Sequence, residues 1–132
     1  MSDLFKKLNL KDQSKIVVLK SPKSFEKELG KLGNVQVLRD LDQAPEFGFV
    51  LAFVTSAEEI EHWANPINEK APGDAVIWFA YPKTTSKKFQ VQINRDRGWD
   101  ALEESGLKPV RQVSIDQDWS ALRFRRKTYI GR

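Results

Sequence analysis

The stretch Ala75-Val76-Ile77-Trp78-Phe79-Ala80, or AVIWFA, decides the fold class of this chain. It has six apolar residues in a row and no alternation with polar residues. This pattern is typical of a strand that is buried on both faces, as in a parallel sheet. Two runs of the same kind precede it, Ile16-Val17-Val18-Leu19 and the run FGFVLAFV at 47–54. Together they predict a central, mainly parallel sheet.

A helix is predicted directly after the first of these runs. Ser21 and Pro22 have the residue types of a helix N-cap and a first helical position. Gly33 stands where a helix often ends in the left-handed conformation. Three apolar residues between these signals have helical spacing: Phe25, Leu29 and Leu32.

A second helix is predicted after the run at 47–54. Ser56 and Glu59 have the S-x-x-E form of a capping box. An amphipathic stripe follows, and we expect Pro66 to kink or restart this helix. A short strand is predicted at 35–38, so strands and helices alternate along the chain.

The last third of the chain predicts a helix and a hairpin. Asn94 can cap a helix that runs through Ser105, and residues 115–119 form a hairpin turn. The order predicts an α/β fold, a single three-layer Rossmann-like domain over residues 1–132. Its sheet would be mainly parallel, with a C-terminal antiparallel hairpin at one edge. This order is similar to the methyltransferase-like variant of the doubly wound fold, but architecture alone does not establish function.

Composition limits the kinds of protein this chain can be. It has 132 residues, 40% of them hydrophobic, which is enough for one domain with a real core. It has no cysteine, so disulfides and cysteine-based zinc sites are excluded. The N-terminus lacks the apolar segment of a secretory signal, and no apolar run reaches the length of a membrane span. We therefore expect a cytoplasmic protein that does not bind membranes.

The positive charge is concentrated at the C-terminus. The net charge is +4, and the last ten residues, RFRRKTYIGR, contain five of the 22 bases and no acid. The remaining 17 bases face 18 acids. The alternation of these cations with Leu122 and Phe124 is typical of an edge strand, where cations discourage edge-to-edge pairing. The alternative is a strip that contacts phosphates. Stacking aromatics are not interleaved with the cations, so the pattern argues against nucleic acid.

Three blocks of sequence resemble a known family. They are KIVVLKSP at 15–22, AVIWFAYPKTTSKK at 75–88 and INRDRGWDALEESGLKPVRQVSIDQDWSALRFR at 93–125. They are similar to an uncharacterised bacterial family of small α/β proteins, described only as a domain of unknown function. The resemblance covers most of the chain. It implies a bacterial cytoplasmic protein with a compact α/β fold, and it implies no activity.

Ligands of open parallel sheets bind beyond the carboxyl ends of the strands. The candidate ligand-binding residues are those that follow the predicted strands: Ser21, Asp40, Thr55, Tyr81, Lys83, Thr84, Thr85, Ser86 and Lys87. Arg95, at the predicted start of the last helix, could clamp an anion or join an Arg–Asp network that anchors its loop.

Asp40 lies about 20 residues beyond the first strand, where dinucleotide-binding folds place a carboxylate on the ribose. The other half of that fingerprint is missing, because the segment KSPKSF contains no glycine. The alternative is that Asp40 only turns the chain.

The loop PKTTSKK at 82–88 offers hydroxyl and ammonium donors to an anion. It lacks the glycines of a phosphate-binding loop, so a solvated connection is the alternative. His62, the single histidine, lies off the apolar stripe and is predicted to be exposed. No cluster of residues requires a metal.

These observations favour a non-catalytic binding or regulatory module. It would hold an anionic ligand or a protein partner at the carboxyl edge of the sheet, with no cofactor. The alternative is a degenerate nucleotide- or methyl-donor-binding enzyme with Asp40 on the ribose. A third hypothesis is weak binding of nucleic acid through the C-terminal strand.

Overall fold

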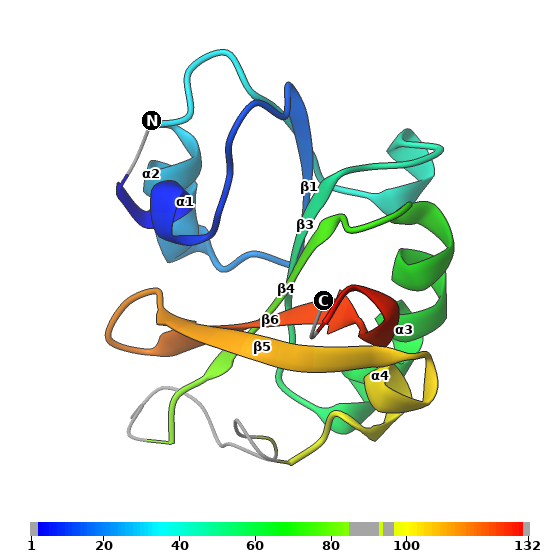
Figure 1. The fold of residues 1–132 in the computed structure, drawn as a ribbon. Coiled ribbons are helices and arrows are strands. Elements are labelled where there is room, and N and C mark those ends of the chain that lie inside the picture. The colour runs from blue at the N-terminus through cyan, green and yellow to red at the C-terminus, as the bar shows by residue number, and fades with distance from the viewer. Residues whose placement is uncertain (1–2, 85–92, 94–96, 131–132) are drawn as a thin grey trace.

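A computed structural model describes residues 3–84, 93 and 97–130. Its centre is a six-stranded sheet in the order β2-β1-β3-β4-β6-β5 (Figure 1). The strands are β1 (Lys15–Leu19), β2 (Gln36–Leu38), β3 (Phe49–Phe53), β4 (Val76–Pro82), β5 (Leu107–Ser114) and β6 (Trp119–Arg126). The first four are parallel, and β6 is antiparallel to both β4 and β5. The predicted mainly parallel sheet with a C-terminal hairpin at one edge is therefore confirmed.

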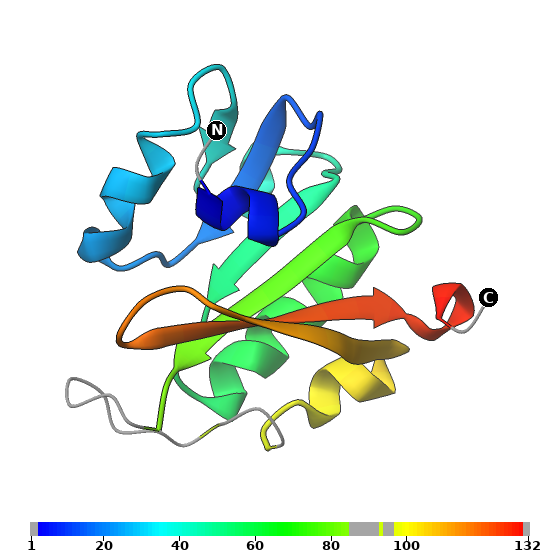
Figure 2. The ribbon, with the colours of Figure 1, turned by 60° about the vertical axis from the view of Figure 1, so that its left-hand side comes forward.

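Helices cover both faces of this sheet. The α-helices are α1 (Asp3–Lys7), α2 (Glu26–Leu29), α3 (Ala57–Lys70) and α4 (Asp100–Glu104). Short 3-10 helices are η1 (Lys23–Phe25), η2 (Leu41–Gln43) and η3 (Lys127–Tyr129). Helices α1 and α2 lie on one side of the sheet, and α3 and α4 lie on the other (Figures 1 and 2). The molecule thus has the three predicted layers, and α1 is a short helix that precedes the first strand.

Each face of the sheet builds its own core. On β1, Ile16 and Val18 pack with α1 and α2, whereas Val17 and Leu19 pack with α3. On β4, Trp78 and Phe79 point to opposite faces, and both are fully buried. This two-sided burial explains why the run AVIWFA has no polar alternation.

The helix after β1 begins differently from the prediction. Ser21 is not its N-cap, because η1 begins at Lys23 with Pro22 as the capping residue and no side-chain cap. The Ser21 hydroxyl instead accepts a hydrogen bond from Arg39 Nη1 at 3.3 Å. Helix α2 ends at Leu29, earlier than the spacing suggested, although Gly33 has the expected positive φ of 68°.

Pro66 is predicted to kink or restart helix α3. The helix runs through Pro66 as one element, so it does not restart there. Proline removes one backbone donor, but Ile60, Ala64 and Ile67 are buried against the sheet along the whole helix. Helix α4 is shorter than predicted, and Asn94, its expected cap, lies outside the described residues. Across the described segments, no helix is both long and apolar enough to span a membrane.

The strand order creates a switch point between β1 and β3. The chain leaves β1 to form β2 on one side, and the next strand, β3, pairs with β1 on the other side. The connections that follow β1 and β3 therefore lead in opposite directions. In open parallel sheets, the crevice at such a point is the usual place for a ligand.

A candidate ligand site at the switch point

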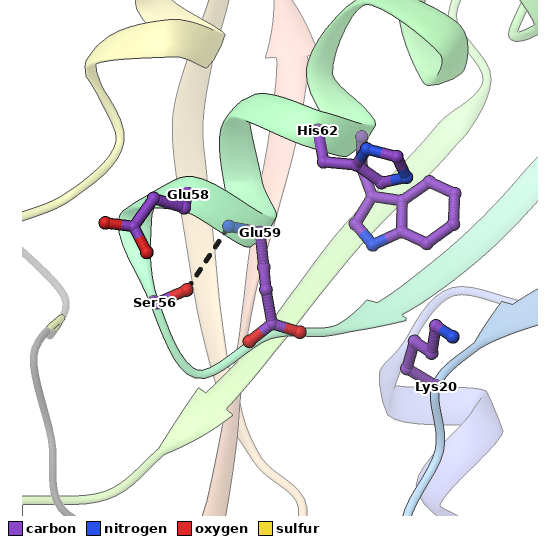
Figure 3. Close-up of a pocket in the computed structure, with 6 residues that line it drawn as sticks. Lys20, Ser56, Glu58, Glu59 and His62 are labelled. Carbon is purple, nitrogen blue, oxygen red and sulfur yellow. Dashed lines mark hydrogen bonds between the residues drawn. The ribbon is translucent and has the colours of Figure 1, made fainter.

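A surface cavity of about 420 Å³ lies at this switch point. That volume is within the usual range of small-molecule sites, roughly 300–1,000 Å³. The lining residues come from the segment after β1 and from the first turns of α3: Lys20, Ser56, Glu58, Glu59, His62 and Trp63 (Figure 3). The cavity thus combines aromatic rings with groups of both charges.

Lys20, the residue directly after β1, has a strained backbone. Its φ is +58°, in the left-handed region that L-residues with long side chains rarely adopt. The other described non-glycine residue with positive φ is Asn9, a residue type that tolerates this conformation. Strain of this kind is concentrated at functional sites.

The turn between β3 and α3 holds one wall of the cavity in place. Ser56 is the N-cap of α3, and its Oγ accepts a hydrogen bond from the Glu59 N–H at 3.3 Å (Figure 3). Glu59 Oε1 accepts two more, from Thr55 N at 2.9 Å and Thr55 Oγ1 at 2.6 Å. The Ser56 half of the predicted capping box is confirmed, while the Glu59 carboxylate reaches one residue further back than a standard box. Thr55, a predicted ligand residue, therefore positions Glu59.

The carboxylates and aromatic rings of α3 occupy different parts of the wall. In Figure 3, Glu58 extends away from Lys20, whereas the Glu59 side chain descends toward the β3–α3 turn. The rings of His62 and Trp63 contact each other edge to face, with centroids 4.6 Å apart. His62 is exposed, as predicted, and Trp63 is partly buried against the core. An indole face at a cavity can stack on a base or attract a cation.

The loop after β1 is tied to the end of β2 by one arginine. Arg39 donates two hydrogen bonds to the Glu26 carboxylate, at 2.9 and 2.8 Å, and a third to Ser21. The hydrogen bond from Arg39 lowers the pKa of Glu26, and the same bond raises the pKa of Arg39. Ser21 is therefore a structural contact that holds the segment beside Lys20.

Asp40 follows Arg39 and is exposed at the carboxyl end of β2. It is the N-cap of η2, and its Oδ1 accepts a hydrogen bond from Asp42 N at 3.0 Å. The turn-forming role considered for Asp40 is thus present in the structure. Its role as a ribose ligand stays a prediction.

Polar side chains at the carboxyl end of β4 contact β5. Tyr81 is buried, and its hydroxyl accepts a hydrogen bond from Gln112 at 2.7 Å. Lys83 Nζ donates to Ser114 Oγ at 2.7 Å. Lys83, a predicted ligand-binding residue, thus directs its ammonium group to β5, and its role toward an anion stays a prediction.

The remaining predicted ligand-binding residues add little to the description of the site. Thr84 is exposed in a turn. Thr85, Ser86, Lys87 and Arg95 lie outside the described residues. Within the described ranges, no three His, Asp or Glu side chains gather in a group that could hold a metal ion.

Sequence reasoning did not identify Lys20, Glu59 and Trp63 as a cavity wall. Glu59 was assigned only to a cap, and Trp63 only to the apolar stripe. The strand order was the feature that could have identified this wall. A helix that starts at a switch point presents its first two turns to the crevice.

No family model matches the sequence, and no curated protein matches it. Solved structures do match. A SAM-dependent methyltransferase from Aquifex aeolicus has a TM-score of 0.55 at 12% identity, with 91% of this chain and 86% of that chain covered. The fibrillarin pre-rRNA processing protein of Methanococcus jannaschii has a TM-score of 0.56 at 12% identity, covering 89% and 68%. Magnesium protoporphyrin IX methyltransferase from Synechocystis PCC 6803, solved with bound SAM, has a TM-score of 0.54 at 12% identity, covering 94% and 74%.

This chain has the Rossmann-like fold of these structures, two of which are methyltransferases. The expectation of a binding or regulatory module for an anionic ligand or protein partner is corrected by these neighbours. The alternative, a degenerate methyl-donor-binding protein of methyltransferase-like architecture, agrees with them better. At this identity the likeness shows the fold alone. The resemblance to an uncharacterised bacterial family, and the cytoplasmic location, stay predictions.

Proposed function

We propose that this chain binds a nucleoside methyl donor of the S-adenosylmethionine type in the switch-point cavity. The observation that supports this most directly is the position of the cavity, beyond the carboxyl ends of β1 and β3 where the strand order reverses. The neighbours of the same fold include methyltransferases, one of them solved with SAM bound.

The residue types around the cavity match the parts of such a ligand. Trp63 offers a ring face for adenine or for the sulfonium cation. Lys20 offers an ammonium group for the ligand carboxylate, and Glu59 a carboxylate for its amino group. Asp40, at the end of the neighbouring strand β2, is available for the ribose hydroxyls.

One feature predicts weak binding. The segment Lys20–Lys23 contains no glycine, so its backbone cannot approach the ligand as closely as a glycine-rich turn does. Bound in the cavity, the methyl donor would supply an electrophilic methyl group. The chain's own residues would hold and orient the ligand through Lys20, Glu59, Trp63 and Asp40.

Thermal unfolding with and without ligand tests this proposal. A ligand that binds only the native state raises the melting temperature by mass action. We expect millimolar SAM or its demethylated product to raise it in a saturable way, and Asp40→Ala to abolish the increase. Asp42→Ala is the matched control, because it removes an exposed carboxylate of the same η2 turn. For each variant, the melting temperature with ligand is compared with that of the same variant without ligand. The loss of the Asp40 cap lowers both temperatures and therefore does not change their difference.

Two results would overturn the proposal. One is the absence of any shift at millimolar ligand. The other is a ligand-induced rise in melting temperature that is equal in Asp40→Ala and Asp42→Ala and is also unchanged in Trp63→Leu. In that case neither Asp40 nor Trp63 would contact the ligand.

A further inference from the structure

The hairpin of β5 and β6 brings four cations to one face of the sheet. Lys108 pairs with Arg125 across the strands, and Arg111 pairs with Arg123. Arg123 also pairs with Trp78 of β4, whose side chain lies in the core beneath α1 and α2. Directly opposed residues of antiparallel strands share a face, so all four cations lie on the α1/α2 side. We refer to Lys108, Arg111, Arg123 and Arg125 as the cationic face.

A β-bulge makes this arrangement possible. Lys108 and Arg111 are three residues apart, and in a regular strand they would point to opposite faces. The register of β5 against β6 shifts between Pro109 and Arg111. The shift turns Arg111 to the face of Arg123, and bulges commonly re-aim a side chain in this way.

The arrangement is electrostatically unfavourable for the isolated protein. Like charges directly opposite each other destabilise a pair of strands. Asp74 pairs with Arg125, at 3.0 and 2.6 Å. Over the described part of the chain, no acid pairs with Lys108, Arg111 or Arg123. Three of the four cations therefore form no ion pair with an acid among the described residues.

Arg123 has an unsatisfied hydrogen-bond donor within the cationic face. Its Nε is buried, and it has no hydrogen-bond partner among the described residues. Burial lowers the pKa of Arg123 and the neighbouring Arg125 lowers it further, while Asp74 opposes this shift and Arg111 adds to it. An unsatisfied buried donor is rare in folded proteins and calls for an explanation such as strain or a functional role.

The face is accessible and has few apolar anchors. Figure 2 shows α1 and α2 beside the β1 end of the sheet, with no described helix in front of the hairpin. Lys108 and Arg111 are exposed. The exposed large hydrophobic residues in the described ranges are Val110 and Tyr129, each 40% exposed. Interfaces with proteins usually depend on buried aromatic or aliphatic anchors, whereas phosphate backbones are bound through cations alone.

We propose that the cationic face binds the phosphate groups of a nucleic acid. Arginine guanidinium groups match phosphate geometry with paired donors. The inference is independent of the proposed function, because this face lies on β5 and β6 and the methyl-donor cavity lies at the ends of β1 and β3. It also departs from the sequence pattern, which favoured a role in protecting the sheet edge. The bulge and the unpartnered Arg123 are visible only in the structure.

Fluorescence anisotropy with labelled nucleic acid tests the proposal. The probes are a mixed-sequence 20-nucleotide RNA strand and a 20-base-pair duplex, each titrated between 50 and 200 mM salt. Each phosphate neutralised changes the slope of log K against log salt by about 0.7 for a single strand and about 0.9 for a duplex. The double variant Lys108→Gln/Arg111→Gln removes two cations. We expect it to reduce the slope by about 1.4 for the single strand and about 1.8 for the duplex, and to weaken binding roughly tenfold or more at 50 mM salt.

The matched control is Lys27→Gln/Lys127→Gln, which removes two exposed cations elsewhere and changes net charge equally. Lys127 lies beside Asp100, Glu103 and Glu104, where a polyanion would be repelled. Arg111→Lys keeps the charge and should keep most of the slope. Melting temperatures of all variants establish that they fold.

Four results would overturn the proposal. The first is no binding of either probe tighter than about 0.1 mM at 50 mM salt, the level of non-specific contacts. The second is an equal loss in the control variant, which would indicate net charge alone. The third is displacement of the RNA by poly-glutamate at equal charge, which would indicate an acidic protein as the partner. The fourth is aggregation of the Lys108→Gln/Arg111→Gln variant when the unmodified protein binds neither probe. That result would indicate that these cations protect the edge of the sheet.

Discussion

Similar polar residues lie at two places on the carboxyl edge of the sheet, the ends of β1 and β3 and the end of β4. They line an open cavity at the first place and are hydrogen-bonded to strand β5 at the second. Lys20 and Glu59 line an open cavity at the first location. At the second, Tyr81 and Lys83 have hydrogen-bond partners on β5. Hydroxyl and ammonium groups after a buried strand therefore do not identify a ligand site by themselves.

The direction of the neighbouring strand explains the difference. Strand β6 is antiparallel to β4, so its first residue, Trp119, pairs with Pro82 at the end of β4. The hairpin thereby places β5 on the far side of β6, and the side chains of Gln112 and Ser114 on β5 bond to Tyr81 and Lys83 at the end of β4. At β1 and β3 the neighbours are parallel and the connecting segments diverge, which leaves a crevice.

The largest effect that we expect comes from the closed end of β4. Tyr81→Ala should lower the free energy of unfolding by about 3 to 5 kcal/mol, because it removes a buried ring that contacts Trp99. Urea denaturation measures the loss, and the shift caused by SAM should be unchanged. Lys83→Ala, whose bond to Ser114 is exposed, should cost less than about 0.5 kcal/mol. A loss of the SAM shift in either variant would show that the two ends form one site.

A smaller effect is expected at the wall of the open cavity. Glu59→Ala removes a carboxylate that accepts two hydrogen bonds from Thr55, and we expect a loss of about 2 kcal/mol in unfolding free energy. The ligand-induced shift should also disappear. Glu59→Gln keeps an acceptor for Thr55 but not the charge, so stability should largely return while the shift stays reduced. A full ligand shift in both variants would contradict a contact between Glu59 and the ligand.

Lys20 gives a prediction in which stability and binding change in opposite directions. Lys20→Gly should raise the free energy of unfolding by up to about 1 kcal/mol, because glycine adopts a positive φ without steric cost. The same change should weaken the SAM shift by removing the ammonium group. Lys20→Ala separates the two effects, since it removes the charge and keeps the strain. If Lys20→Gly is no more stable than Lys20→Ala, the backbone at this position is not strained.

The smallest effect concerns the ion pair that secures the loop beside Lys20. The pKa of Glu26 is lowered in the folded state by the hydrogen bond from Arg39. At pH values above the ordinary pKa of 4.5, the lowered pKa of Glu26 stabilises the folded state. This stabilisation is lost as the pH falls through the lowered pKa of the folded protein. Glu26→Gln should therefore narrow the difference in stability between pH 7 and pH 3. Denaturation curves at the two pH values, with Lys31→Gln as a control on another exposed ion pair, measure the change. An unchanged pH dependence would show that this pair contributes nothing measurable.

The sequence by itself determined the fold class and several local features. Burial on both faces requires apolar residues at every position, so the strands containing Val17, Val50 and Ile77 could be recognised without tertiary information. The Ser56 cap and the left-handed Gly33 were equally predictable, because each depends on a few adjacent residues.

Only the tertiary structure decided which polar groups have partners. The direction of Lys83 depends on Ser114, 31 residues away, and the alignment of Arg111 with Arg123 depends on a bulge within a strand pair. The positive φ of Lys20 occurs at a residue type that does not favour this conformation, so the residue type gave no indication of it. The direction of Lys83 and the alignment of Arg111 arise from contacts between distant segments. The local pattern of residue types therefore located the edge of the sheet where a ligand could bind, and the packing of neighbouring strands decided which part of that edge is open.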